Sequence, residues 1–237
     1  MHVVPAEAGT QVLRAPSGCT QPWVPACAGT TAFPPTRMNE PLVIAGLATS
    51  PLELISFLLA VTTVVLNIRQ KHWAWLFSIA SSATYAVVFY DARLYGDMGL
   101  QFVFIAASVW GWYQWLHGAA GVSTAPLLPT FLKPGGRAWS LAAWLAGFVL
   151  LSTFLDNFTD TDVPHADGFL TAGSLVGQLL LAKKKVENWH VWIAVDILYV
   201  GLYLYKGLVL TAVLYGVFVL LAIAGLRTWA ALARERA

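Results

Sequence analysis

The chain has 237 residues, of which 58% are hydrophobic and 11% are charged, whereas a soluble domain has about 25% charged residues. This composition excludes an ordinary water-soluble domain and favours a protein solvated by a lipid bilayer. One helical crossing takes roughly 20 apolar residues, so about seven or eight crossings would fill the chain. The net charge of +2 is too small for a nucleic-acid surface, and we expect no nucleic-acid partner.

Residues 1–37 are rich in Pro, Gly and Thr, and one short pattern occurs twice, at residues 4–10 and 24–30. Two copies are too few for a solenoid, and the stretch lacks the apolar core of a signal peptide. We interpret residues 1–37 as translated repetitive DNA upstream of a natural start at Met38; a disordered tail is the alternative. Peptides from this stretch in mass spectra of the native protein would contradict the first interpretation.

Seven apolar runs of spanning length follow, each bounded by charges, Pro or Gly. The predicted helices cover residues 51–69, 73–91, 94–117, 137–155, 164–182, 187–205 and 208–231. The segment 42–48 is apolar but too short to cross a bilayer, so we expect it to lie at the membrane surface. The predicted fold class is an all-α integral membrane protein, with residues 38–237 as its transmembrane domain.

Seven crossings sort the basic residues onto one side of the membrane. One side holds Arg69, Lys71, Lys133, Arg137, Lys183, Lys184, Lys185, Arg227, Arg234 and Arg236. The other side holds Arg93 and Lys206 with five aspartates, Asp91, Asp156, Asp160, Asp162 and Asp167. Because basic loops stay in the cytoplasm, this sorting predicts an external N-terminus and a cytoplasmic C-terminus.

The chain also matches itself at a constant offset of 114 residues. The matched pairs are Trp75 and Trp189, Tyr85 and Tyr199, Leu94 and Leu208, Leu100 and Leu214, Val103 and Val217, Phe104 and Phe218, Gly111 and Gly225, and Trp115 and Trp229. We predict two three-helix repeats, at about 51–117 and 164–231, joined by a linker helix at about 137–155. A single linker crossing keeps the repeats parallel, and transporters of this plan bind substrate at the repeat interface.

The helix at 187–205 carries the most informative residues. Trp189, Trp192 and Asp196 stand at i, i+3 and i+7, which places them on one face. A carboxylate inside a bilayer costs about 2.5–3.5 kcal/mol on insertion scales, so we expect Asp196 to face a wet cavity or a partner. Two indole rings beside a carboxylate suit a flat, positively charged ring. The alternative is an interfacial Trp pair, with Asp196 bonding a neighbouring helix.

The helix at 94–117 adds Asp97 and Gln101, one turn apart. The Gln101 amide can donate and accept, which suits a carboxamide, whereas Asp97 has the alternative of a solvated helix start. Three polar residues of the helix at 164–182 are more typical of contacts between helices: Thr171, Ser174 and Gln178. No metal-ligand spacing, nucleophile motif or phosphate loop occurs, so we expect neither an enzyme nor a cofactor.

Several segments together resemble the PnuC family of vitamin transporters. They are residues 89–97 with Leu100 and Gln101, residues 111–115, residues 185–189 with Trp192 and Asp196, residues 206–208 and residues 225–229. The resemblance implies parallel three-plus-one-plus-three helices, a repeat arrangement similar to that of full-length sugar transporters. Trp189, Trp192 and Asp196 match the family's substrate motif, and Gln101 matches a polar position of its third helix.

The resemblance further implies facilitated diffusion of a vitamin precursor across the bacterial inner membrane, with a cytoplasmic kinase that traps the product. Nicotinamide riboside, a precursor for NAD synthesis, is the expected substrate. Thiamine, also an aromatic cation, stays an alternative. A homo-oligomer is compatible with these features. A membrane assembly or receptor protein is the more remote alternative, and such a protein would not need a buried Asp196.

Overall fold

The structure is a computed structural model that describes residues 42–44, 47–49, 51–91, 95–118, 127–159, 163–205 and 209–235. The chain divides into two compact units, Met1–Pro51 and Leu52–Ala237. In the first unit the described part is a hairpin of two antiparallel strands, β1 (Leu42–Ile44) and β2 (Leu47–Thr49). The sequence analysis gave no strand here. Residues 1–37, which we interpreted as an extension, lie outside the described residues.

Seven helices follow in the described residues, which confirms the predicted helical composition. They are α1 (Pro51–Ile68), α2 (Ala74–Asp91), α3 (Tyr95–His117), α4 (Pro134–Phe158), α5 (Pro164–Ala182), α6 (Asn188–Tyr205) and α7 (Val209–Arg234). The predicted bounds are right to within three residues. The largest errors, of three residues, are at both ends of α4 and at the end of α7. Helix α4 starts at Pro134 although the following Gly135 and Gly136 are typical of a loop. Pro is accepted there because the first helical residue needs no N–H donor.

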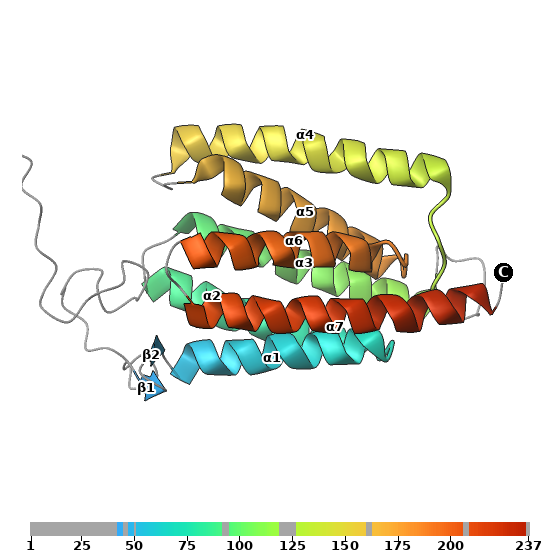
Figure 1. The fold of residues 1–237 in the computed structure, drawn as a ribbon, viewed down its shortest axis with the longest axis horizontal. Helices are drawn as coiled ribbons and strands as arrows, with labels where there is room; N and C mark the ends of the chain where they lie inside the picture. Colours follow the sequence, from blue (N-terminus) through green and yellow to red (C-terminus); the bar gives the residue numbers. More distant parts are fainter. Residues whose placement is uncertain are drawn as a thin grey trace, which may run out of the picture. The chain divides into compact units, whose positions relative to one another are not determined.

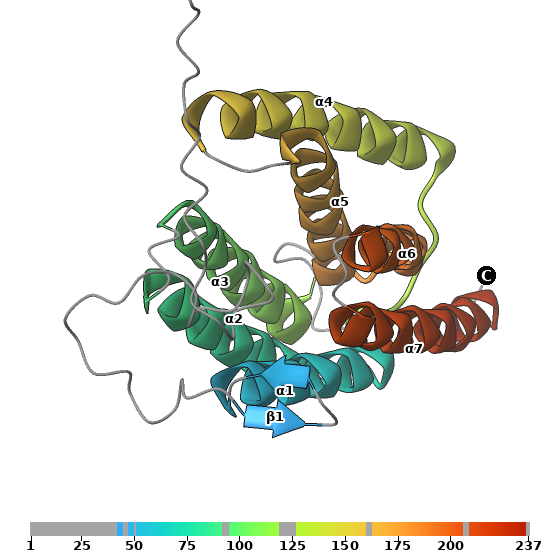
Figure 2. The ribbon, with the colours of Figure 1, turned by 60° about the vertical axis from the view of Figure 1, so that its left-hand side comes forward.

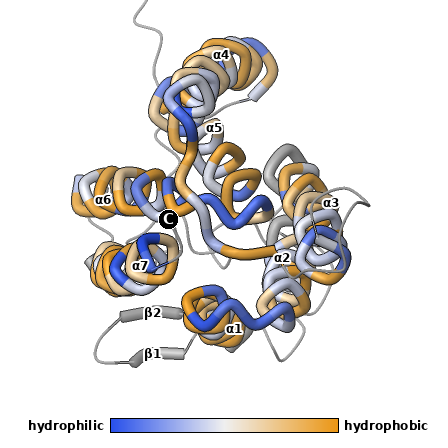
Figure 3. The backbone as a smooth tube through the Cα atoms, turned by 90° about the vertical axis from the view of Figure 1, so that its right-hand side faces the viewer, coloured by the Kyte–Doolittle hydropathy of each residue, from blue (hydrophilic) through white to orange (hydrophobic). Residues whose placement is uncertain are grey.

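Six helices surround the interior and α4 lies outside them. Helix α5 packs on α3, α4 and α6, while α2 packs on α3 and α6 on α7. Phe57 of α1 meets Phe218 of α7, with ring centroids 5.7 Å apart. The end-on view in Figure 3 shows the resulting order α1, α2, α3, α5, α6, α7 around the interior. Figures 1 and 2 show α4 lying on α5, away from α1.

The outer surface of the helical unit is apolar. Large side chains stand exposed on every side, including Phe102, Trp139, Leu150, Phe158 and Leu220. A soluble monomer rarely exposes a continuous apolar surface of this kind, whereas lipid chains solvate it. In the described residues, α4 and the segment Ala212–Arg234 of α7 are each long and apolar enough to span a bilayer by composition alone. Two further apolar helical stretches, Phe57–Ile68 and Ala74–Val87, are shorter than a bilayer crossing within the described residues.

The basic loops meet at one end of the bundle, which we call the basic end. Figure 3 looks onto this end and shows the hydrophilic segments of α1, α5 and α7 gathered there. Helices α1 and α5 finish at this end in the same way. Gln70 and Lys184, which are 114 residues apart, both adopt left-handed backbone angles, with φ of 54° and 48°. The next amides, of Lys71 and Lys185, each donate to a helix carbonyl five residues earlier.

Two tryptophans tie helices of the two predicted repeats together at the basic end. Trp115 of α3 donates its indole N–H to the carbonyl of Leu181 at 3.2 Å. Trp229 of α7 donates to the carbonyl of Asn67, also at 3.2 Å. Both the donors and the acceptors are 114 residues apart. The same carbonyls also accept backbone amides of the following turns, Asn67 from Gln70 at 3.0 Å and Leu181 from Lys184 at 2.9 Å. Each indole therefore adds a second hydrogen bond, from the other predicted repeat, at the end of α1 or α5.

A short strand segment before α4 is fastened to the loop between α5 and α6, and we call this set of contacts the linker staple. Thr130 N–H donates to the Lys184 carbonyl, and Val186 N–H donates to the Thr130 carbonyl, each at 3.1 Å. Glu187 accepts from the Leu132 amide at 2.9 Å, and its other oxygen pairs with Arg137 at 3.0 Å. The staple therefore fixes the chain just before α6 begins.

Candidate functional site

Helix α6 turns its candidate residues inward. Trp189 and Asp196 are 2% and 6% exposed, whereas Ile197 and Leu198, directly after Asp196, are 53% and 47% exposed. The i, i+3, i+7 spacing thus corresponds to a buried face, as the sequence predicted for these three residues. Along this face, two indole rings come first and a carboxylate follows them.

Trp189 lies in a tightly packed aromatic core. Its ring meets Trp229 edge-on, with centroids 5.4 Å apart at 89°, and a β-carbon on Gly225 would lie 2.6 Å from its ring atoms. Trp75 has the same surroundings 114 residues earlier, meeting Trp115 at 5.4 Å and 88° and lying against Gly111. A ligand could therefore reach the faces of Trp189 only if Trp229 moved.

Trp192 lies one turn further into the bundle and is partly buried. Its ring lies along α5, where a β-carbon on Gly177 would stand 3.1 Å from Cε2 and 3.3 Å from Nε1. The glycine lets α5 approach the indole closely, and it fixes the ring at the boundary between α5 and α6. Trp192 thus stands between the aromatic core and Asp196.

Asp196 is a buried carboxylate with no basic side chain paired to it in the part of the chain that the structure describes. Its charge acts instead on the phenols of Tyr199 and Tyr215. Tyr199 also interacts with Asp167 of α5 and shares a side-chain hydrogen bond with Ser174. The surroundings of Asp196 are therefore polar, negative and aromatic. Such a place is costly to bury unless a cation or water completes it.

Gln101 and Asp97 are brought into the fold by α3. Gln101 is half-buried, and within the described residues it makes no hydrogen bond to Trp192 or Asp196. At the offset of 114 its counterpart is Tyr215, which does lie near Asp196. Asp97 belongs to the first turn of α3, and its side chain lies outside the described residues.

A polar chain joins α2, α3 and α5 and was left out of the predicted site. Ser78 and Ser108 hydroxyls are 3.0 Å apart, and Gln178 Nε2 donates to the Ser108 hydroxyl at 3.2 Å. The sequence analysis took Gln178 and Ser174 as contacts between helices, and this bond agrees with that reading for Gln178. Ser108 carried no signal in the sequence, because a single serine in an apolar helix is common.

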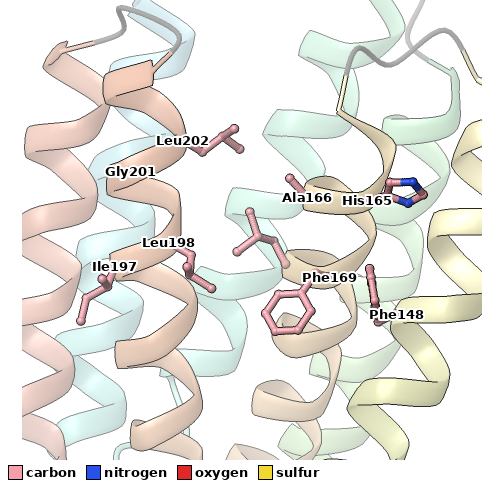
Figure 4. A pocket seen from close by; sticks show the side chains of 9 residues that line it. Phe148, His165, Ala166, Phe169, Ile197, Leu198, Gly201 and Leu202 are labelled. Carbon is pink, nitrogen blue, oxygen red and sulfur yellow. The ribbon is translucent and has the colours of Figure 1, made fainter.

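One hollow in the described part of the chain lies elsewhere, on the outside of the bundle. Figure 4 shows it between α4, α5 and α6, with a volume of about 540 Å³ and His165 as its polar lining residue. Ile197 and Leu198 face it, on the side of α6 opposite Asp196. Because its walls are apolar and open to the lipid side, we do not place the substrate there. The described residues also contain no group of acidic, His or Cys side chains that could hold a metal.

The comparisons with known proteins agree with this architecture. A family model described as nicotinamide mononucleotide transporter matches residues 50–231. The chain belongs to this transporter family. The match covers the seven helices, so the predicted PnuC resemblance is confirmed.

Several relatives are similar over most of their length. The riboflavin/roseoflavin transporter RibM of Streptomyces davaonensis is 26% identical over 178 residues, covering 75% of this chain and 83% of RibM. The nicotinamide riboside transporter PnuC of Escherichia coli is 21% identical over 223 residues, covering 84% of this chain and 93% of PnuC. A crystal structure of the vitamin B3 transporter PnuC superimposes with a TM-score of 0.63 at 24% identity, covering 78% and 83% of the two chains.

Family membership bears directly on the predicted class of function. The family and these relatives are transporters and not enzymes, as the sequence predicted. The relatives carry different vitamins, so membership alone leaves the substrate open between them. The chemical groups around Asp196 can distinguish between these candidate substrates.

Proposed function

We propose that this protein takes up nicotinamide riboside across the bacterial inner membrane by facilitated diffusion. A cytoplasmic kinase then phosphorylates the product and traps it for NAD synthesis. One observation carries the proposal: Asp196 is a buried carboxylate on the inner face of α6, flanked by aromatic rings and unpaired with any basic side chain of the described residues. Nicotinamide riboside offers a flat cationic ring, a carboxamide and a diol, for which the predicted site offers aromatic rings, the Gln101 amide and the Asp196 carboxylate.

In this proposal each predicted residue has a role. Asp196 accepts hydrogen bonds from the ribose diol and balances the ring charge, while Trp192 flanks the ring. Gln101 approaches the carboxamide from α3, and Asp97 lies one turn nearer the outer mouth. Trp189 fixes the position of Trp192 and contacts substrate only when Trp229 withdraws.

We further propose that α1–α3 and α5–α7 are parallel repeats, with α4 as the linker. The matching tryptophan contacts, the two left-handed turns and the order of helices in Figure 3 support this arrangement. The basic end then lies in the cytoplasm by the positive-inside rule, which makes the C-terminus cytoplasmic and the N-terminus external. Rocking of one repeat against the other would open the substrate site to either side.

Riboflavin is a second candidate, because RibM is among the relatives. Riboflavin is neutral, so it would leave the charge of Asp196 without a counter-ion. Thiamine is a cation like nicotinamide riboside and meets the same charge requirement. The balance of charge therefore favours a cationic vitamin, and between the two cations the carboxamide and diol favour nicotinamide riboside.

Calorimetric binding of nicotinamide riboside, thiamine and riboflavin to the purified protein tests the proposal. We expect the wild type to prefer nicotinamide riboside, and Trp192→Ala and Asp196→Ala to abolish that binding. Leu198→Ala, on the outer side of α6, is the matched control and should bind normally. Preference for riboflavin that persists in Asp196→Ala would contradict both the substrate and the site.

A further inference from the structure

Three tyrosines form a compact aromatic cluster on α6 and α7. Tyr199 and Tyr203 stack one turn apart with ring centroids 5.8 Å apart at 17°. Tyr215 of α7 closes the group, 4.7 Å from Tyr199 and 5.1 Å from Tyr203. All three are half-buried rather than fully buried, although they lie between helices. At 1.5 Å per residue the cluster begins about 16 Å along α6 from Asn188, well away from the basic end.

Two carboxyl groups lie within electrostatic reach of the tyrosine cluster. Asp196 stands one turn before Tyr199, and its carboxylate acts on the phenols of both Tyr199 and Tyr215. Asp167 of α5 acts on Tyr199 from the neighbouring helix. Two carboxylates and three electron-rich rings therefore meet at one place. Aromatic faces beside carboxylates are the groups that attract an organic cation.

The internal repeat separates framework residues from this cluster. The packing residues are kept in both halves: Trp75 matches Trp189, Trp115 matches Trp229, and Gly111 matches Gly225. Of the cluster, Tyr199 is kept as Tyr85, whereas the other residues differ. The counterparts of Asp196, Tyr203 and Tyr215, 114 residues earlier, are Ser82, Phe89 and Gln101. Packing alone would not require this difference, whereas an asymmetric ligand needs different chemistry from the two halves.

We propose that Tyr199, Tyr203 and Tyr215, together with Asp196, form the receptor for the cationic ring of the substrate, and that they set the preference for cationic over neutral vitamins. The inference rests on the proposed function for the identity of the substrate. It adds the three tyrosines, which follow Asp196 along the fold, to Trp192 as the aromatic surroundings of the ring. The opposite half supplies Gln101, the counterpart of Tyr215, for the uncharged groups of the same ligand.

The test compares two ligands of nearly the same shape. Nicotinamide riboside carries a cationic aromatic ring, and its 1,4-dihydro form carries a neutral ring. For the wild type we expect binding of the cation to be stronger by at least about tenfold, from the contribution of aromatic faces to cation binding. Tyr215→Leu and Tyr203→Leu should bring the ratio of the two affinities, cation over neutral form, towards one. Tyr215→Phe keeps the aromatic ring and should keep most of this affinity ratio.

Tyr205→Leu provides the matched control, because Tyr205 is on the same helix and 85% exposed. It should leave the ratio unchanged. The ratio between two ligands on one protein sample does not depend on the folded fraction, so a destabilised variant still gives an answer. Thermal unfolding of each variant checks that it is folded.

The outcomes distinguish this inference from the proposed function. If the wild type prefers nicotinamide riboside but the Leu variants keep its ratio, the tyrosine receptor is overturned and the proposed function stands. If the wild type prefers thiamine and the Leu variants weaken thiamine binding about tenfold, the receptor is supported and the proposed substrate is wrong. Binding of riboflavin alone, with no organic cation bound, would overturn both.

Discussion

Trp189 and Trp75 show how one residue type serves two purposes in this chain. Both rings are almost fully buried, and each has a glycine on one side and a tryptophan edge on another. Only Trp189 is followed by an indole and a carboxylate at i+3 and i+7. The equivalent positions after Trp75 are Ser78 and Ser82. The tryptophan is thus part of the framework in both halves, and the specific chemistry comes after it.

The glycines under these rings give a direct prediction. A β-carbon at Gly225 would overlap the Trp189 ring, and one at Gly111 would overlap the Trp75 ring. We expect Gly225→Ala and Gly111→Ala to lower the free energy of unfolding by about 1–3 kcal/mol, as overpacking does. Thermal unfolding in detergent measures the change.

Matched controls lie on the same two helices. Gly216 of α7 and Gly99 of α3 have no atom within 4 Å of an added β-carbon. Gly216→Ala and Gly99→Ala should therefore be neutral, or stabilising by up to about 1 kcal/mol through helix propensity. Equal destabilisation by all four substitutions would mean that the close approach of the rings has no special role.

Lys184 gives a prediction about pH. It lies in the loop between α5 and α6, and its ammonium is 4.4 Å from the centre of the Trp115 ring and 3.4 Å from the Gln70 amide oxygen. Burial lowers the pKa of Lys184 from 10.5 to about 8. Between these two pH values the unfolded chain binds more protons, so the free energy of unfolding should rise with pH across this window.

The size of this effect is bounded by about 1.4 kcal/mol for each unit of pKa difference. Thermal unfolding between pH 7 and pH 10 measures it. Lys184→Gln introduces the residue that occurs 114 positions earlier, at Gln70. It removes the titrating amine, so the free energy of unfolding should depend less on pH. A variant with the same rise as the wild type would exclude Lys184 as its source.

At the scale of elements, the linker staple positions the start of α6. Glu187 satisfies a backbone amide and a guanidinium at once, whereas Arg137 is 60% exposed. We expect Glu187→Ala to cost about 1–3 kcal/mol, because it leaves the Leu132 amide without its acceptor. Arg137→Ala should cost at most about 1 kcal/mol, as exposed ion pairs do.

A double-mutant cycle in thermal unfolding measures the coupling of the pair. Because Arg137 acts through Glu187, the double variant should be no less stable than Glu187→Ala alone, within a few tenths of a kcal/mol. A cost for Arg137→Ala as large as that for Glu187→Ala would contradict this order.

The helices could be predicted from the sequence because their apolar runs are continuous and each is bounded by charges, Pro or Gly. The linker staple could not be predicted, because it joins Thr130 to Lys185 and Leu132 to Glu187 across 55 residues and leaves no local pattern. The spacing correctly predicted that Trp189, Trp192 and Asp196 share one face of α6, and their role in binding stays a prediction. The spacing of Trp189 and Trp192 could not reveal that Trp229 and Gly225 already cover the first ring, and the tyrosine cluster spans two helices.

For the whole molecule, the hydrogen bonds between the two predicted repeats concentrate at the basic end. The indoles of Trp115 and Trp229 donate to the carbonyls of Leu181 and Asn67. The Lys184 ammonium donates to the side-chain amide oxygen of Gln70. Opening toward that end must break these bonds. We expect Trp229→Phe, which removes the N–H donor, to favour the open state.

Maleimide labelling of a cysteine at Ala182, which is fully buried at the basic end, measures this opening. In a background without Cys19 and Cys27, labelling should be several-fold faster with Trp229→Phe, since one lost hydrogen bond is worth about 1 kcal/mol. Trp139→Phe, on the exposed face of α4, is the control. Unchanged labelling would place the moving contacts elsewhere.

Transport energetics give the last prediction at this scale. The strongest candidate carboxylate, Asp196, is assigned to substrate, so we expect uptake of nicotinamide riboside into proteoliposomes without an ion gradient. Addition of an uncoupler should leave the rate unchanged. A collapse of transport would mean that a coupling ion shares the site.

The tryptophan hydrogen bonds between the two predicted repeats also constrain the order in which contacts form during synthesis of the chain. Helices α1–α3 leave the ribosome first, and at that moment the carbonyl of Leu181, which Trp115 needs, has not been made. The carbonyl of Asn67 likewise waits for Trp229, 162 residues downstream. The first half is therefore synthesised before either of these hydrogen bonds can form, and both exist only after α5 and α7 have been made. A chain that ends before α5 lacks both contacts.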